Sequence, residues 1–182
     1  MNNIIDCHSH ILPKYLQYEG NTFRRILERC AKQNIVWVVI SVDYTEISCV
    51  EPLLQIAKGH DTQVAVTFGF QPPASLGRRK EIEEDLKKAL PLARELAEKK
   101  VIVAIGEIGL DYYWPAVEFL KGQGISNPNE IDQQMSKNHQ QLLKEKPVED
   151  CLQLQKEIFR RWIELARLIN LPIVVHERDA YS

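Results

Sequence analysis

Short runs of β-branched and other apolar residues alternate along the chain with longer stretches that have helical spacing. Residues 35–42 are almost continuously apolar, which is typical of a strand buried on both faces. Residues 149–169 repeat apolar side chains with the period of an amphipathic helix. By the same criteria we expect strands at 3–7, 35–42, 63–68, 101–105 and 172–175, and helices at 22–33, 47–58, 79–99 and 149–169.

This alternation predicts βαβ units and hence a parallel sheet in an α/β fold. Both an open doubly wound sheet and a (β/α) barrel fit it. Only a few residues, ending at Ser182, follow the fifth strand, and no helix covers it. We therefore expect the first five βα units of a TIM-type barrel, in a single domain at 1–182 with an insertion at 114–147. Pro91 lies inside the expected helix 79–99 and either kinks it or divides it.

Composition places the chain among globular proteins. Of 182 residues, 45% are apolar and 26% are charged, with 23 Lys and Arg against 25 Asp and Glu. A net charge of −2 provides no overall basic field for holding nucleic acid. No apolar run is long enough to cross a bilayer, and the start does not resemble a signal peptide. The four scattered cysteines form no CxxC pair, so we expect a reducing, cytoplasmic setting without membrane contact.

The candidate chemistry lies where the expected strands end. His8 and His10 directly follow the first strand, and residues two apart on an extended chain point the same way. Glu107 follows the fourth strand and His176 follows the fifth. In a parallel barrel these ends converge on the face that carries the active site, so we expect a metal site there. Glu107 can bridge two cations, with His176 on the second. The plainer interpretation of each residue is a solvated loop position.

Three motifs resemble those of the TatD-type deoxyribonucleases, which belong to the amidohydrolase superfamily. They are IDCHSH at 5–10, IGEIGLDY at 105–112 and LPIVVHERDA at 171–180. The resemblance implies a barrel that hydrolyses phosphodiester bonds, often in DNA and from an end, with two divalent metal ions (Mg²⁺, Mn²⁺ or Zn²⁺). It also implies that His8 and His10 bind one metal, that Glu107 bridges both and that His176 binds the second.

The chain departs from the family pattern in two places. The family usually has Gly-x-His-Pro after the third strand, whereas this chain has GFQP at 69–72, with Gln71 in place of the histidine. A glutamine forms hydrogen bonds but cannot transfer a proton at neutral pH, so Gln71 implies a different substrate or a lower rate. The family's later metal-ligand histidine and aspartate would lie beyond Ser182.

Several polar residues near these motifs have two interpretations each. Arg178 either clamps a phosphate beside His176 or is an ordinary surface arginine. Asp43, at the end of the second strand, either lines the same rim or caps a helix. For Asp111 we expect a bracing role in its loop rather than metal binding, and for Cys7 a place in the core.

The aromatic residues fall into two groups. Trp37 and Trp162 have the spacing of core residues. Tyr112, Tyr113 and Trp114 follow the metal loop, where they either stack on a base or cover the barrel mouth. The lysines of 114–147 either track a phosphate backbone or form a solvated surface.

Three functions fit the sequence. The first is a TatD-like DNase that cleaves DNA or another phosphodiester through metal-activated water. The second is a related barrel hydrolase that acts on a small phosphoester, lactone or amide. The third is a truncated, non-catalytic remnant that binds metal. Because five barrel units leave two unpaired sheet edges, we also expect self-association or a complementing fragment.

Overall fold

A computed structural model describes residues 3–10, 16 and 21–180. The strands and helices alternate as the sequence predicts. In chain order they are β1 (Ile4–Ser9), α1 (Asn21–Lys32), β2 (Ile35–Asp43), η3 (Tyr44–Cys49), α2 (Val50–Ala57), β3 (Gln63–Gly69), α3 (Arg79–Glu98), β4 (Ala104–Asp111), α4 (Tyr113–Gly122), α5 (Pro128–Leu142), α6 (Lys146–Leu168) and β5 (Ile173–Arg178).

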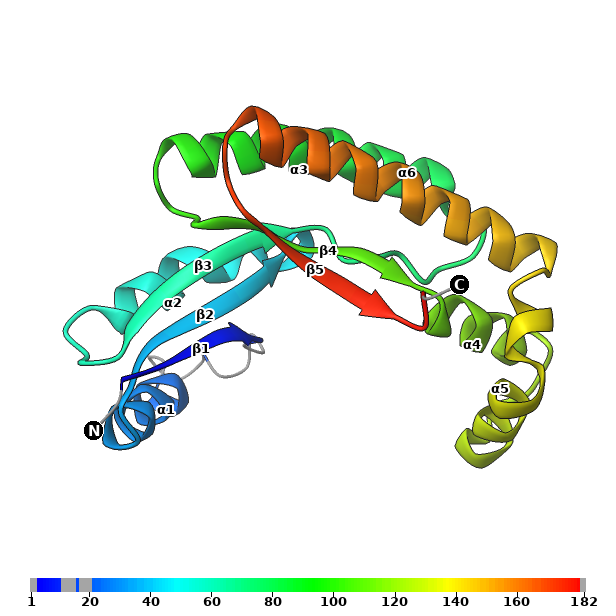
Figure 1. The fold of residues 1–182 in the computed structure, drawn as a ribbon, viewed down its shortest axis with the longest axis horizontal. Coiled ribbons are helices and arrows are strands. Elements are labelled where there is room, and N and C mark those ends of the chain that lie inside the picture. Colours follow the sequence, from blue (N-terminus) through cyan, green and yellow to red (C-terminus); the bar gives the residue numbers. More distant parts are fainter. Residues whose placement is uncertain (1–2, 11–15, 17–20, 181–182) are drawn as a thin grey trace.

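The strands form one parallel sheet in the order β1-β2-β3-β4-β5. Spatial order equals sequence order, so each crossover moves the chain one strand along in the same direction. A doubly wound sheet reverses direction at a switch point, and this sheet does not. Figure 1 shows the strands curling into part of a barrel, with α3 and α6 side by side on its outer surface. The expected partial TIM-type barrel is confirmed.

The main core lies between the sheet and its outer helices. Along β2, Val38, Ile40 and Val42 are buried in this core, in the alternating positions that face one side of a strand. Trp162 of α6 is fully buried against Phe68 of β3, with ring centroids 6.3 Å apart. The expected core position of Trp162 is therefore confirmed.

Two expected core residues lie elsewhere. Trp37 is 42% exposed, because it occupies the face of β2 opposite to the core residues Val38, Ile40 and Val42. Cys7 is exposed on β1, which is an edge strand of the described sheet. The half-exposed Ile5 on β1 and Val175 on β5 lie on the two edge strands. Association through these edges stays a prediction, and sedimentation velocity of the purified chain would measure it.

Two boundaries differ from the sequence prediction for reasons of backbone chemistry. The expected helix 47–58 is a 3₁₀ turn followed by α2. Pro52 lies in the first turn of α2, where its missing N–H leaves no helical hydrogen bond unmade, so the α-helix begins at Val50 and the residues before it form the 3₁₀ turn. By contrast, α3 continues past Pro91 without division. Strand β4 begins at Ala104 and includes Glu107, rather than ending at 105.

The region 114–147 is helical in the described structure. It contains most of α4, all of α5 and the first residues of α6. Its helices share a small core of their own, formed by Ala116, Val117, Leu120, Ile131, Met135 and Leu142. In Figure 1, α4 and α5 lie beyond the tip of β4, at the end of the sheet where the candidate residues are found.

Candidate metal centre

Three side chains from two strands converge at the carboxyl end of the sheet. His8 belongs to β1, His10 follows it directly, and Glu107 belongs to β4. The two histidine Nε2 atoms are 3.1 Å apart. The Oε2 atom of Glu107 lies 3.7 Å from Nε2 of His8 and 3.2 Å from Nε2 of His10. The curled sheet therefore brings together donors that are about a hundred residues apart in the sequence.

These separations fit the coordination shell of one divalent cation. Bonds of about 2.0–2.1 Å at tetrahedral angles put neighbouring ligand atoms roughly 3.3 Å apart. The three donor atoms lie within 4.8 Å of one another, and their separations bracket that value. Two imidazole nitrogens and a carboxylate oxygen suit zinc, manganese or iron more than calcium. The cluster of His8, His10 and Glu107 can hold a metal ion.

A buried pair of hydroxyl groups orients His8. Ser41 Oγ lies 3.2 Å from Nδ1 of His8 and 2.9 Å from Oγ1 of Thr67. Both hydroxyl residues are buried. With Nδ1 engaged by Ser41, the Nε2 atom of His8 faces the cluster. Metal-binding histidines usually have such a partner on the second nitrogen, so this contact favours a ligand role over a solvated loop histidine.

His176 lies beside the cluster, between two carboxylates. Its Nδ1 is 2.9 Å from Oε1 of Glu107, and its Nε2 is 3.1 Å from Oδ2 of Asp111. The hydrogen bonds to Asp111 and then to Glu107 raise the pKa of His176 to about 9. In the absence of a cation the imidazolium therefore donates to both carboxylates at neutral pH. A cation bound at Nδ1 would have to displace a proton.

Glu107 connects the two groups of histidines through its separate oxygens. Oε2 faces His8 and His10, whereas Oε1 faces His176. The side chain is only 11% exposed. The hydrogen bond from His176 lowers the pKa of Glu107, and the neighbouring histidines add to this effect against the cost of burial. Glu107 is thus an ionised, two-sided acceptor, which is the form that a bridging ligand needs.

Asp111 is fixed at the end of β4 by both backbone and side-chain contacts. Its Oδ1 accepts the backbone N–H groups of Tyr113 at 3.0 Å and Trp114 at 2.9 Å. Burial raises its pKa, but the hydrogen bond from His176 and those from the two N–H groups together lower it below the usual value. Asp111 braces its loop as predicted, and it also orients His176, which the sequence did not predict.

The sequence of the chain matches a known protein family. Residues 5–182 match the model of the family described as TatD related DNase. The chain belongs to this family. The matching residues include every donor in the cluster, so the metal centre lies inside the TatD-related part of the chain.

Two named relatives match the chain at low identity. An uncharacterized metal-dependent hydrolase, YabD of Bacillus subtilis, is 27% identical over 97% of this chain and 51% of its own length. Human deoxyribonuclease TATDN3 is 24% identical over 97% of this chain and 53% of its own length. The chain thus spans about half the length of the curated relatives that it matches.

Two solved structures share the fold over about half of their own chains. An uncharacterized amidohydrolase from Saccharomyces cerevisiae has a TM-score of 0.61 and 17% identity, covering 98% of this chain and 49% of the yeast chain. A TatD family hydrolase from Entamoeba histolytica has a TM-score of 0.60 and 17% identity, covering 98% of this chain and 50% of its own.

No helix of the described residues combines the length and apolar composition needed to cross a membrane.

The remaining candidate residues, Gln71, Asp43 and Arg178, have other contacts. The backbone N–H of Gln71, just after β3, donates to Oδ2 of Asp43 at 2.8 Å, and Gln71 is exposed. Asp43 caps η3 by accepting from the N–H of Thr45 at 2.9 Å. The capping interpretation of Asp43 is therefore confirmed. The guanidinium of Arg178 lies over the ring of Tyr113, 4.3 Å from its centroid.

Glycines bring the strands of the TatD motif close together. At Gly109, where φ is +158°, a Cβ atom would overlap the backbone carbonyl of His176. Only a residue without a side chain allows β4 and β5 to approach in this way. The position of His176 against Glu107 and Asp111 therefore depends on Gly109.

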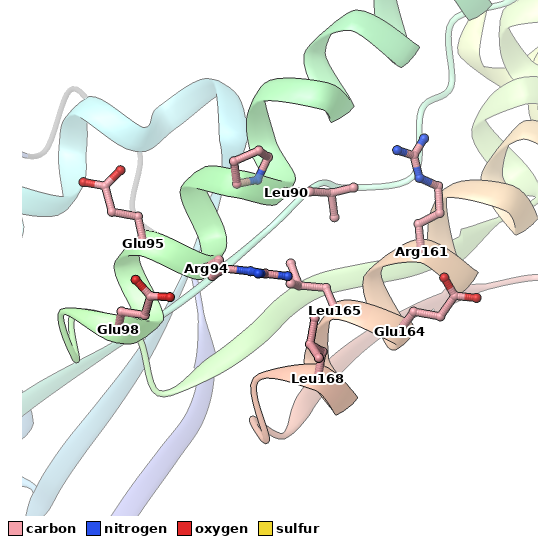
Figure 2. A pocket seen from close by; sticks show the side chains of 9 residues that line it. Leu90, Arg94, Glu95, Glu98, Arg161, Glu164, Leu165 and Leu168 are labelled. Carbon is pink, nitrogen blue, oxygen red and sulfur yellow. The ribbon is translucent and has the colours of Figure 1, made fainter.

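A groove on the outer surface is separate from the metal centre. Figure 2 shows it between α3 and α6, with Leu90 and Arg94 on one side and Arg161, Glu164 and Leu168 on the other. Its volume is about 530 Å³. None of its lining residues belongs to the TatD motifs, so the chemistry is assigned to the strand ends.

Sequence reasoning did not single out Ser41, Thr67 or Asp111 as parts of the centre. A signal for the first two was present. Ser41 is a polar residue in the otherwise apolar run 35–42, and Thr67 occupies a similar position in β3. A buried hydroxyl in an apolar strand needs a hydrogen-bond partner, and here that partner is a site histidine.

Proposed function

We propose that this TatD family member cleaves phosphodiester bonds of DNA at the strand-end centre. The observation that carries the proposal is the convergence of His8 Nε2, His10 Nε2 and Glu107 Oε2 at ligand spacing. The family membership and the similarity to human deoxyribonuclease TATDN3 support DNA as the substrate. The chain's coverage of half the relatives' length makes the activity of these 182 residues a matter for experiment.

In this proposal each of two divalent cations has its own ligands. His8, His10 and Oε2 of Glu107 would hold the first, and Oε1 of Glu107 with Nδ1 of His176 would hold the second. Such cations lower the pKa of bound water and neutralise phosphate charge. Asp111 holds His176 through Nε2, so that Nδ1 faces Glu107. Mg²⁺, Mn²⁺ and Zn²⁺ are the cations to test.

The test is hydrolysis of a single-stranded oligonucleotide by the purified chain with added Mg²⁺ or Mn²⁺, together with analysis of bound metal. We expect His8→Ala to remove both hydrolysis and bound metal. His60→Ala is the matched control, because His60 lies in the loop after α2, where its backbone N–H bonds the carbonyl of Ala57. Circular dichroism confirms folding of each variant. Hydrolysis that survives His8→Ala would contradict the proposed centre.

A small phosphoester, lactone or amide is the alternative substrate, and Gln71 is the observation that favours it. Gln71 stands where the family usually has a histidine, and its side chain cannot transfer a proton at neutral pH. Metal-dependent cleavage of bis(4-nitrophenyl) phosphate without cleavage of DNA would support this alternative. Bound metal without turnover of either substrate would favour a non-catalytic metal-binding protein.

A further inference from the structure

Two aromatic rings and two cations gather where β4 passes into α4. Tyr113 and Trp114 open α4, and their rings meet edge to face with centroids 5.3 Å apart. The Arg178 guanidinium lies 4.3 Å from the Tyr113 centroid and 5.3 Å from that of Trp114. The Lys121 ammonium lies 5.7 Å from the Trp114 centroid. We call these four residues the aromatic–cation cluster.

Short contacts tie this cluster to the metal centre. Asp111 accepts the backbone N–H groups of Tyr113 and Trp114 through Oδ1 and meets His176 through Oδ2. His176 in turn contacts Glu107. Arg178 lies two residues after His176 on β5. The aromatic–cation cluster is therefore held at a fixed position beside the metal donors, on the same end of the sheet.

Trp114 is not used as a core residue. Trp114 is 41% exposed on the surface of α4, whereas the next three residues, Pro115, Ala116 and Val117, are buried. The indole thus offers partly exposed apolar surface, with the Arg178 and Lys121 cations over its ring. Lys121 also pairs with Glu118 at 2.7 Å, but Arg178 has no ion pair among residues 3–10, 16 and 21–180.

We propose that the aromatic–cation cluster binds a single-stranded nucleic acid, with an unpaired base stacked on Trp114. Arg178, whose charge lacks an acidic partner in the described structure, would contact the adjacent phosphate. Stacking needs the open face of a base, which a duplex hides, so this surface selects single strands. The inference rests on the proposed function and extends it, because it adds a substrate-binding site beside the proposed hydrolytic centre.

The experiment measures binding separately from hydrolysis. Fluorescence anisotropy of a labelled single-stranded octathymidylate is followed in EDTA, where no divalent cation is available. We expect Trp114→Ala to raise the Kd by about 5- to 150-fold, the range of one base–aromatic stack. Trp37→Ala is the matched control, because Trp37 is 42% exposed but lies near the start of β2, and we expect less than a twofold change.

An abasic octamer with the same phosphates isolates the stacking contact. We expect the native chain to bind it more weakly than octathymidylate, and Trp114→Ala to cause no further loss on this probe. Arg178→Ala should reduce the salt dependence of binding by about one counterion on both probes. Trp114→Phe should keep part of the affinity, since a smaller ring still stacks. Thermal melts establish that each variant is folded.

The outcomes separate this inference from the proposed function. No binding of octathymidylate by the native chain, or equal affinity of Trp114→Ala and the native chain, would overturn the inference, even if DNA is hydrolysed. Binding that depends on Trp114, without hydrolysis under any metal condition, would support the aromatic–cation cluster and overturn the proposed hydrolysis of DNA.

Discussion

Gln155 provides a quantitative test of how the centre is supported. Its side chain is fully buried on α6 and forms hydrogen bonds with both backbone polar groups of Asp111, the last residue of β4. Oε1 accepts the N–H of Asp111 at 2.9 Å, and Nε2 donates to the carbonyls of Asp111 and Pro73, each at 2.9 Å. One amide therefore joins α6, the loop after β3 and the residue that orients His176.

Replacing Gln155 with leucine keeps the approximate size and removes all three hydrogen bonds. The Pro73 carbonyl retains a contact from Cys151 Sγ at 3.2 Å, so the main losses are the N–H and carbonyl of Asp111. Each buried group left unpaired costs about 1–3 kcal/mol. Burial of the more apolar leucine side chain offsets roughly 1–2 kcal/mol of this loss of stability. With the middle value of each range, we expect Gln155→Leu to lower the free energy of unfolding by about 2.5 kcal/mol.

Urea unfolding followed by circular dichroism measures this difference. The matched control is Gln153→Leu, because Gln153 is exposed on the same helix and its substitution should change stability by less than about 0.5 kcal/mol. The loss is large against a typical total of about 5–15 kcal/mol. Equal stability of the two variants would refute the assignment of Gln155 as a structural hydrogen-bond donor and acceptor.

Gln155→Glu tests the same contacts through pH. The introduced carboxyl would face the carbonyl oxygens of Asp111 and Pro73, which can only accept, so the folded chain favours the protonated acid. Its pKa is then raised above the unfolded value of about 4.3. Above that pH the unfolded state binds fewer protons, so stability falls as pH rises. A pH–stability curve parallel to that of the native chain would contradict the inferred hydrogen-bond directions.

Two further predictions concern the strands and the histidine support. Gly109→Ala should lower the free energy of unfolding by about 2–4 kcal/mol and displace His176, because the new methyl overlaps its carbonyl. Gly122→Ala, with open space around it, should change stability by less than about 1 kcal/mol, and equal denaturation midpoints would refute the close approach. Ser41→Ala should weaken Zn²⁺ or Mn²⁺ binding by about 10- to 100-fold in calorimetry, because His8 loses its partner on Nδ1. An affinity within twofold of the native chain would contradict that role.

The sequence predicted the order of elements because the apolar pattern is strong. The run 35–42 reads as a buried strand, and β2 occupies Ile35–Asp43. The fourth strand was placed too early because Gly106 and Gly109 weaken the local strand signal. In the fold these glycines lie within β4, where Gly109 allows close approach to β5. A tertiary requirement thus overrides local propensity at this point.

The donors of the metal centre could be predicted, whereas their orientation could not. His8 and His10 are adjacent on one strand end, so a local motif indicates them. Their role as ligands stays a prediction until metal is measured. The position of Arg178 is a different case, because its side chain lies over Tyr113 rather than in the cluster of donors. Because Arg178 is two residues after His176 on an extended strand, the sequence predicts which face of the strand it lies on. It does not predict the direction in which its long side chain extends.

The groups that orient the histidines are distant in sequence and buried beneath the rim. Ser41 lies 33 residues from His8, and Asp111 lies 65 residues from His176. Each partner comes from a different strand from the histidine that it contacts. A linear motif therefore indicates which atoms can bind metal, while the packing of neighbouring strands decides which ring nitrogen is free to do so. For this reason, substitutions at Ser41 and Asp111 should affect metal affinity without removing a donor from the His8, His10 and Glu107 cluster.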